Sequence, residues 1–175
     1  MKLNVCCGQD YREGYINIDF SDVGVNGSKV KIDVVHDILN GLPYPENSAD
    51  EIVFREALEH FHRLQGLDIL KELYRVLKPG GKLDLTVPPA LKQLKMLLIQ
   101  LQNAKSVPIE DFLYAHERFS VWKWHDDLMG APNPKKAYGD SHLTLFSPET
   151  LRTLVEHVGF KVLTINEEIQ LYATK

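Results

Sequence analysis

Leu3-Asn4-Val5-Cys6-Cys7-Gly8 is an apolar run that ends in a tight turn, and Tyr15-Ile16-Asn17-Ile18-Asp19 is a second apolar run that ends in an acid. In a parallel α/β sheet, the carboxyl ends of such strands open where the strand order reverses, and nucleotides bind there. A small residue in the turn lets a ligand approach the backbone. A carboxylate at the tip of the second strand can accept both hydrogens of a ribose diol.

The rest of the chain alternates between strand and helix patterns. A helix is predicted over residues 63–77, where leucines recur on one stripe, and Lys78-Pro79-Gly80-Gly81 ends it. A second helix begins at Ser147-Pro148 and ends at Gly159. Short apolar segments rich in β-branched residues are predicted as strands covered on both faces. These strands span residues 2–6, 15–20, 30–35, 51–54, 82–87, 161–165 and 169–174.

The last two strands decide between related sheets. Only Asn166-Glu167-Glu168 joins them, which suffices for a hairpin but not for a parallel crossover. The predicted fold is therefore α/β, with a doubly wound, mostly parallel seven-stranded sheet that ends in an antiparallel hairpin. With 175 residues, the chain is predicted to form one domain over residues 1–175, in which residues 88–146 form a long insertion.

Composition excludes several classes of partner. The chain has 20 basic and 24 acidic residues, a net charge of -4 and no basic block, so nucleic acid is not expected as a partner. No apolar run reaches the roughly 18 residues of a membrane span, and the two adjacent cysteines suggest reduced thiols, so a cytoplasmic location is expected. His60-Phe61-His62 lacks further ligands at recognisable spacing, so no metal is expected.

The order of these motifs resembles the class I S-adenosylmethionine-dependent methyltransferase family, and most resembles small predicted methyltransferases of bacterial surface-polysaccharide clusters. The resemblance implies a Rossmann-like methyltransferase fold with S-adenosylmethionine as cofactor. It also implies methyl transfer to an oxygen or nitrogen of a small polar acceptor, with a sugar or nucleotide sugar as one option. The matching segments are residues 3–8, 17–19, 33–37, 42–50, 58–60 and 72–81.

The resemblance assigns the cofactor residues. Asp19 is expected to bind the ribose hydroxyls, and Asp37 to accept the adenine amino group beside the backbone of Ile38. Asp33 and His36 compete for the adenine role. Asp37 is favoured because it follows the predicted third strand, whereas Asp33 lies within it. Arg55 follows the fourth strand, where the family contacts the methionyl part of the cofactor.

The glycine-rich turn departs from the family pattern. Asn4, Cys6 and Asp10 stand where an acid and the first and third glycines are expected, and only Gly8 remains. Cys6 is expected to need ordinary backbone angles, and Asp10 to cap the turn or contact the methionine amino group. This loss of glycines keeps open an alternative, a cofactor-binding partner or regulatory protein without catalysis. A nicotinamide-dependent oxidoreductase is disfavoured because the chain lacks Gly-x-Gly-x-x-Gly.

Acceptor-side candidates lie later in the chain. His60 and His142 occupy segments that resemble acceptor-side family motifs, and a neutral imidazole could take a proton from an attacking hydroxyl. Trp122, Trp124 and Tyr138 fall in the insertion, where aromatic faces can stack on an acceptor such as a sugar. The same aromatic residues would serve equally well as a homodimer contact.

Overall fold

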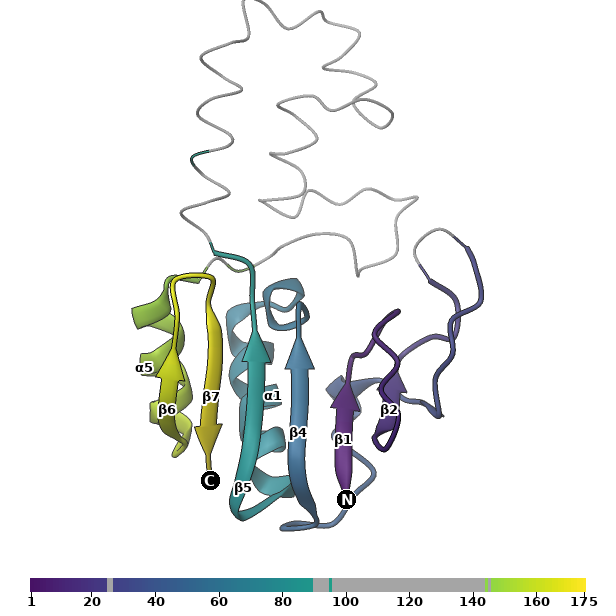
Figure 1. Cartoon of the computed structure of the whole chain (residues 1–175), viewed down its shortest axis with the longest axis horizontal. Helices are drawn as coiled ribbons and strands as arrows, with labels where there is room; N and C mark the ends of the chain where they lie inside the picture. The colour runs from purple at the N-terminus through teal and green to yellow at the C-terminus, as the bar shows by residue number, and fades with distance from the viewer. Residues whose placement is uncertain (25–26, 90–94, 96–143, 145) are drawn as a thin grey trace, which may run out of the picture.

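Seven strands form one sheet in the computed structural model, in the order β3-β2-β1-β4-β5-β7-β6 (Figure 1). The structure describes residues 1–24, 27–89, 95, 144 and 146–175. Chain order reverses between β1 and β4, so the strand tips at that point form the position at which such sheets bind ligands. The strands are β1 Lys2–Val5, β2 Ile16–Asp19, β3 Val34–Val35, β4 Ala49–Arg55, β5 Leu77–Thr86, β6 Lys161–Ile165 and β7 Gln170–Thr174.

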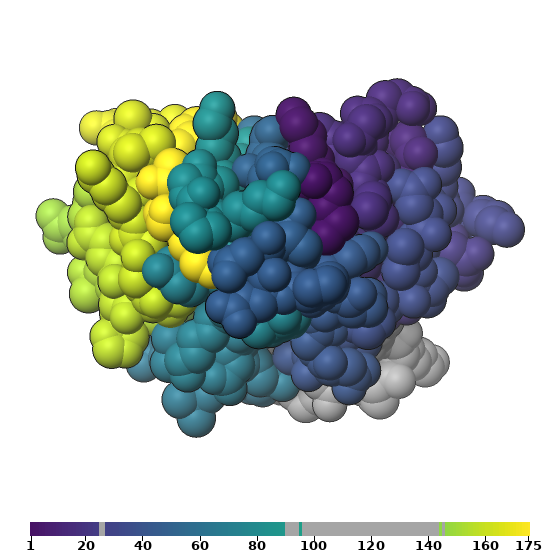
Figure 2. Space-filling view, turned by 90° about the horizontal axis from the view of Figure 1, so that it is seen from below, coloured from purple at the N-terminus to yellow at the C-terminus, as the bar shows by residue number. Residues whose placement is uncertain are grey.

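Strand directions confirm the predicted fold class. β1 pairs in parallel with both β2 and β4, and β4 continues in parallel to β5. β7 is antiparallel to both β5 and β6, which gives the predicted terminal hairpin. In Figure 2, which views the molecule from below, the hairpin and the first two strands lie toward opposite ends.

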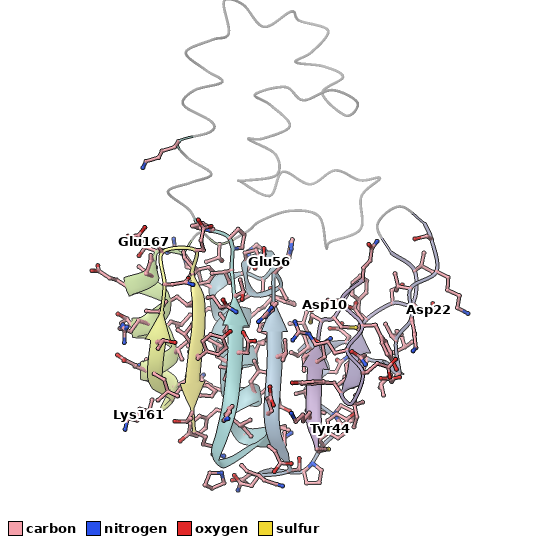
Figure 3. All side chains as sticks on the ribbon, viewed as in Figure 1. Asp10, Asp22, Tyr44, Glu56, Lys161 and Glu167 are labelled. Atoms are coloured by element: carbon pink, nitrogen blue, oxygen red, sulfur yellow. The ribbon has the colours of Figure 1, made fainter. Side chains whose placement is uncertain are left out.

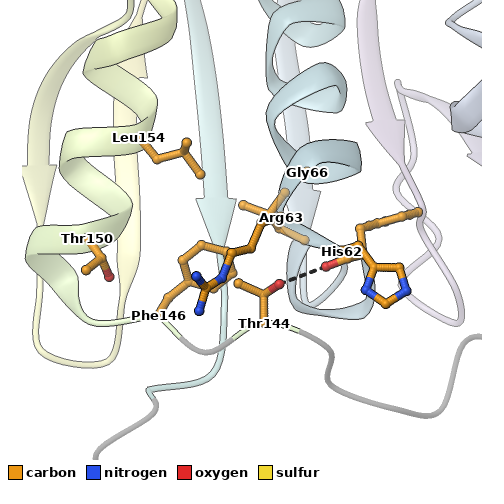
Figure 4. A pocket seen from close by; sticks show the side chains of 9 residues that line it. His62, Arg63, Gly66, Thr144, Phe146, Thr150 and Leu154 are labelled. Atoms are coloured by element: carbon orange, nitrogen blue, oxygen red, sulfur yellow. Dashed lines mark hydrogen bonds between the residues drawn. The ribbon is translucent and has the colours of Figure 1, made fainter. Parts of the chain in front are cut away.

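In the described part of the chain, α1 Arg63–Val76 and α5 Pro148–Val158 lie on the same face of the sheet, as Figures 1 and 4 both show. Ser147 caps α5 by accepting a hydrogen bond from Thr150 N, and Gly159 ends it with a left-handed φ of 117°, as predicted. Two short 3₁₀ helices follow strand tips: η1 Ile38–Asn40 after β3, and η2 Leu58–His60 after β4.

The core lies between these helices and one face of the sheet. Leu3, Ile52, Leu83 and Ala173 form one row across four strands, and all are buried. Because side chains alternate along a strand, the neighbouring row points to the other face.

The other face is more polar than expected. Its central row is Asn4, Val53, Asp84 and Tyr172, and the guanidinium of Arg55 pairs with Asp84 beside it. Asn4, Val53 and Asp84 are nevertheless buried, so the sheet is covered on both faces at these positions, as predicted, although polar side chains lie on the second face. In β1 and β5, apolar and polar side chains alternate along the strand instead of forming a continuous apolar run.

Several element boundaries differ from the prediction by one or two residues, and β3 and β5 differ by more. β3 contains only Val34–Val35, so Asp33 precedes the strand instead of lying within it. β5 begins at Leu77, and its pairing with β4 has a register break between Ala49 and Glu51, so the predicted helix stop at 78–81 lies in the strand. Of the described helices, none has the length and apolar character needed to span a bilayer.

Candidate functional site at the strand tips

The turn after β1 keeps a tight shape although it has few glycines. Cys6 has φ 53° and Gly8 has φ 50°, so both adopt left-handed backbone. Asp10 N–H donates to the carbonyl of Cys7 over 2.8 Å and closes the turn. The expectation of ordinary angles at Cys6 is therefore wrong. A side chain costs about 1–2 kcal/mol in this conformation, and the surrounding structure must offset that cost.

Asp19 ends β2 beside this turn, with only 8% of its surface exposed. Its Oδ2 accepts a 2.8 Å hydrogen bond from Gly8 N–H, and its Oδ1 accepts one from Phe20 N–H, also 2.8 Å. A carboxylate oxygen has two lone pairs, so each oxygen can still accept a hydrogen from a ligand. Nothing lies within 4 Å of the position where a side chain on Gly8 would begin, which leaves room for a ligand against the backbone.

Asp33 and Asp37 have separate roles in the structure. Asp33 accepts hydrogen bonds from the backbone and the side-chain amide of Asn17, which lower the pKa of the Asp33 carboxyl. Asp37 follows β3 and caps η1, its Oδ1 accepting from Leu39 N–H over 2.9 Å. The competing His36 binds the carbonyl of Gly41 through its ring. Asp33 and Asp37 are both exposed, but only Asp37 follows the carboxyl end of β3, and Ile38 beside it is buried.

At the tip of β4, the guanidinium of Arg55 forms an ion pair with a carboxylate on the neighbouring strand β5. Arg55 Nη2 and Nε contact the Asp84 carboxylate on β5 at 2.5 and 3.2 Å. Glu56 follows with φ 49°, so the backbone turns left-handed after β4 as it does after β1. Figure 3 places Glu56 at the tip of β4 and Asp10 near the tip of β1. The Asp10 carboxylate itself pairs with Arg12 over 2.7 Å at the surface.

The short helix η2 holds two titratable side chains. Glu59 is 2% exposed, and burial, reinforced by the charge of Glu56, raises the pKa of its carboxyl to about 8. His60 Nε2 lies 3.8 Å from Glu59 Oε1. The sequence predicted His60 as a candidate base but did not predict that Glu59 is buried. The Leu-Glu-His segment alone is equally compatible with an exposed glutamate.

A cavity of about 310 Å³ lies between the N-terminal turns of α1 and α5 (Figure 4). Leu58, Phe146 and Leu154 are among its lining residues, and Thr144 Oγ1 donates to the carbonyl of Phe61 over 2.9 Å at its edge. The lining residues include none of the cofactor candidates. The cavity is therefore separate from the residues at the tips of β1, β2 and β3.

The structure brings the predicted cofactor residues to one edge of the sheet. Cys6 and Gly8 follow β1, Asp19 ends β2, Asp37 and Ile38 follow β3, and Arg55 ends β4. Burial raises the pKa of the Cys6 thiol, and the nearby charges of Asp19, Asp37 and Glu59 raise it further. The acceptor-side candidates Trp122, Trp124, Tyr138 and His142 lie outside the described residues.

Sequence reasoning missed Phe20 at this edge. Its side chain is 57% exposed although it directly follows Asp19. An exposed aromatic residue beside the acid at this strand tip offers a flat surface on which a purine could stack. Phe20 continues the apolar alternation of Ile16 and Ile18, so it was interpreted only as the end of a strand.

Comparison with known proteins places this architecture among characterised families. Residues 3–165 match the family model described as "Methyltransferase domain". A demethylmenaquinone methyltransferase from Listeria welshimeri is 34% identical over 100 residues, which cover 46% of this chain and 42% of that protein. A sterol 24-C-methyltransferase from Pneumocystis carinii is 52% identical over 40 residues, covering 23% of this chain and 10% of that protein. The matches thus span less than half of either relative.

Solved structures with the same fold cover nearly the whole chain. A methyltransferase from Methanosarcina mazei superposes with a TM-score of 0.59 at 19% identity, covering 99% of this chain and 89% of that one. One from Archaeoglobus fulgidus gives a TM-score of 0.57 at 18% identity, covering 94% and 64%. At such identities these structures establish the fold.

Proposed function

This chain belongs to the methyltransferase-domain family, and from that premise we propose that it transfers a methyl group from S-adenosylmethionine to a small-molecule acceptor. S-adenosylmethionine is the expected cofactor of such a domain. The observation that carries the proposal is the Asp19 carboxylate, which the Gly8 N–H holds at the tip of β2.

The residues at the strand tips fit this cofactor. Both oxygens of Asp19 keep a lone pair for a ribose hydroxyl, and the space above Gly8 allows close approach of the sugar. Asp37 lies at the next strand tip with one oxygen engaged by Leu39, so its carboxylate can also accept from an adenine amino group. Phe20 would lie against the face of the base.

At the other end of the site, one acidic and one basic side chain could bind the methionine part of the cofactor. In the proposal, Asp10 pairs with the methionine amino group and Arg55 with the methionine carboxylate. Both already form ion pairs, with Arg12 and Asp84 respectively, and both pairs keep contact with solvent. The pairs fix the direction of each charged group, and a carboxylate or a guanidinium has capacity for a further partner.

Little catalytic machinery is required of the chain. The cofactor supplies a methyl group already activated by its positive sulfonium, so the protein mainly aligns the acceptor and excludes water. An acceptor hydroxyl must also lose a proton. His60, on η2 after β4, is the proposed base within the described residues, and His142 is the second candidate.

The acceptor is proposed to be a small polar molecule methylated on oxygen or nitrogen, such as a sugar or nucleotide sugar. The names of the two relatives give demethylmenaquinone and carbon 24 of a sterol as targets of those proteins. A carbon acceptor is therefore the second candidate. Methyl transfer to carbon also releases a proton, so a base could serve either acceptor, and the position of the labelled methyl group in the product separates the two possibilities.

The alternative of a catalytically silent cofactor-binding protein rested on the loss of glycines after β1. The turn nevertheless adopts left-handed backbone at Cys6 and still presents Gly8 N–H to Asp19. These features favour retained cofactor binding, which both possibilities require. Only a measurement of methyl transfer distinguishes an enzyme from a cofactor-binding protein without catalysis.

The proposal is tested with S-adenosylmethionine labelled in its methyl group and a panel of sugars, nucleotide sugars, amines and quinols. We expect label to enter one class of acceptor with equal release of S-adenosylhomocysteine, and expect Asp19→Ala to lower the transfer rate about tenfold or more at limiting cofactor. Tight S-adenosylhomocysteine binding with no transfer to any acceptor would favour the silent partner instead.

A further inference from the structure

Two buried asparagines hold the segment that joins β1 to β2. Residues 6–15 connect these parallel strands without a helix, so their backbone N–H and C=O groups lack helical partners. The side chains of Asn4 on β1 and Asn17 on β2 meet beneath this segment, and the two residues are 2% and 0% exposed. We call this pair the amide clamp.

Asn17 uses both ends of its amide. Its Oδ1 accepts from Arg12 N–H over 2.8 Å and from Asn4 Nδ2 over 2.9 Å. Its Nδ2 donates toward the carbonyls of Arg12 and Tyr15, at 3.0 and 3.1 Å, and toward Asp33 Oδ2 at 2.8 Å. One side chain therefore ties the crossover segment to the residue that precedes β3.

Asn4 extends the clamp to the turn. Its Nδ2 donates to the carbonyl of Asp10 over 2.6 Å, and Asp10 N–H closes the turn onto Cys7. That turn contains Gly8, whose N–H holds the Asp19 carboxylate. Hydrogen bonds, joined by the main chain of the turn, thus connect the clamp to the acid that the proposed function assigns to the ribose.

We propose that Asn4 and Asn17 are positioning residues that set this turn in its cofactor-binding geometry before the cofactor arrives. The inference rests on the proposed function, and it adds residues that touch no part of the cofactor. Both positions require an amide because each side chain must donate to a main-chain carbonyl, that of Asp10 for Asn4 and that of Arg12 for Asn17. The Asn17 side chain must also accept from the N–H of Arg12. A carboxylate cannot donate to those oxygens, and an apolar side chain would leave buried groups unpaired.

The clamp also explains how a turn with few glycines keeps its shape. Cys6 occupies left-handed backbone at a cost that glycine would avoid. Bonds from the clamp to Asp10 and Arg12 constrain the segment that follows and so oppose relaxation of Cys6. Loss of the clamp should therefore release the turn and lower cofactor affinity, with the helical layer unaffected.

The first test replaces Asn17 by leucine, which has a similar size and no polar atoms. In Asn17→Leu we expect the dissociation constant for S-adenosylhomocysteine, measured by calorimetry, to rise at least about tenfold, as loss of several buried hydrogen bonds predicts. In the ligand-free protein, the amides of Gly8, Asp10 and Arg12 should exchange hydrogen faster. Amides of α5 should be unchanged.

Two controls separate positioning from general loss of stability. Val155→Ala removes buried methyl groups from α5, on the far side of the core, and should lower the melting temperature without faster exchange at residues 8–12. Asn166→Leu removes an exposed amide that accepts from Gln170 N–H in the β6–β7 hairpin. Neither control should change the affinity for S-adenosylhomocysteine more than about twofold.

A second variant guards against failure of Asn17→Leu to fold. Asn4→Asp places a carboxyl between the oxygens of Asp10 and Asn17, where only its protonated form can donate. The affinity of this variant relative to the wild type should therefore fall as pH rises through the neutral range. A merely structural lesion would give a ratio that does not depend on pH.

The outcomes distinguish this inference from the function on which it rests. If the wild type binds S-adenosylhomocysteine and both clamp variants bind it equally well, the positioning role is wrong and the proposed function stands. If the wild type does not bind it at all, both are wrong. Faster exchange in Asn17→Leu without any loss of affinity would likewise overturn the positioning role, since the turn would then not need to be set in advance.

Discussion

The main-chain N–H of Gly8 donates a 2.8 Å hydrogen bond to Oδ2 of Asp19, and so joins the turn after β1 to the acid at the tip of β2. Neighbouring parallel strands thereby present one preformed unit at the point where the chain order reverses. The carboxylate is fixed before any ligand binds, because both of its oxygens already accept from backbone N–H groups.

Replacement of Asp19 should weaken cofactor binding. In Asp19→Ala the ribose hydroxyls lose a charged acceptor, which costs about 1.5–3 kcal/mol, or roughly tenfold or more in affinity. Calorimetry with S-adenosylhomocysteine measures the loss. Asp22→Ala, which removes a half-buried acid close to Asp19 in the sequence, with its Oδ2 3.7 Å from Lys29 Nζ, is the matched control and should leave the affinity unchanged. Equal affinities for the two variants would remove Asp19 from the site.

Asp37 should recognise the adenine amino group. Asparagine at position 37 can still cap η1, so Asp37→Asn changes the acceptor while it keeps the local structure. We expect the wild type to prefer S-adenosylhomocysteine over S-inosylhomocysteine, which carries a carbonyl in place of the amino group. Asp37→Asn should lose that preference in competition binding. A variant that keeps the full preference would assign recognition of the base to another residue.

Cys6 should tolerate glycine better than alanine. Both replacements remove the sulfur, but only glycine relieves the left-handed backbone at φ 53°. Urea unfolding should therefore give Cys6→Gly a free energy of unfolding about 1 kcal/mol above that of Cys6→Ala. The neighbouring Cys7 is buried and has no positive φ, so the order of its glycine and alanine variants should be the opposite. The same order at both positions would show that the backbone of Cys6 is not strained.

Glu59 should make folding stability depend on pH. Burial raises the pKa of its carboxyl from 4.5 to about 8, so between these values the folded protein keeps a proton that the unfolded chain has lost. The resulting stability is complete below pH 4.5 and is lost as pH rises toward 8.

Glu59→Gln stays neutral and should lack this decline. Urea unfolding across the same pH range compares it with the wild type and with Glu167→Gln, which changes an exposed acid in the β6–β7 connection. The wild type and Glu167→Gln should lose stability together as pH rises, relative to Glu59→Gln. Three parallel profiles would show that Glu59 is ionised in the folded protein at neutral pH.

Local signals were sufficient for much of the fold. The three-residue connection of the last two strands predicted the hairpin, and Ser147 and Gly159 predicted both ends of α5, because turns and caps depend on residues close in sequence. The tips of β1 and β2 were found in the same way. Gly8 follows the first apolar run and Asp19 ends the second, so both positions are visible in the sequence.

Long-range packing decided what the sequence could not show. The backbone of Cys6 takes a glycine-like angle because residues from β2 hold the following turn, and no local pattern reveals that support. Asp33 was placed in a strand, whereas its carboxylate binds Asn17, a partner that is visible only once β2 and β3 are paired. The main chain at Glu59 likewise has a partner far away along the chain, because its carbonyl accepts from Thr144 N–H.

The central claim is that the strand tips of this chain bind S-adenosylmethionine or its product. Calorimetric titration of S-adenosylhomocysteine into the wild-type protein tests this most directly, with NADH titrated in parallel. The account predicts saturable one-to-one binding of S-adenosylhomocysteine and no binding of NADH. Absence of S-adenosylhomocysteine binding in the folded protein, or saturable binding of NADH in its place, would contradict it.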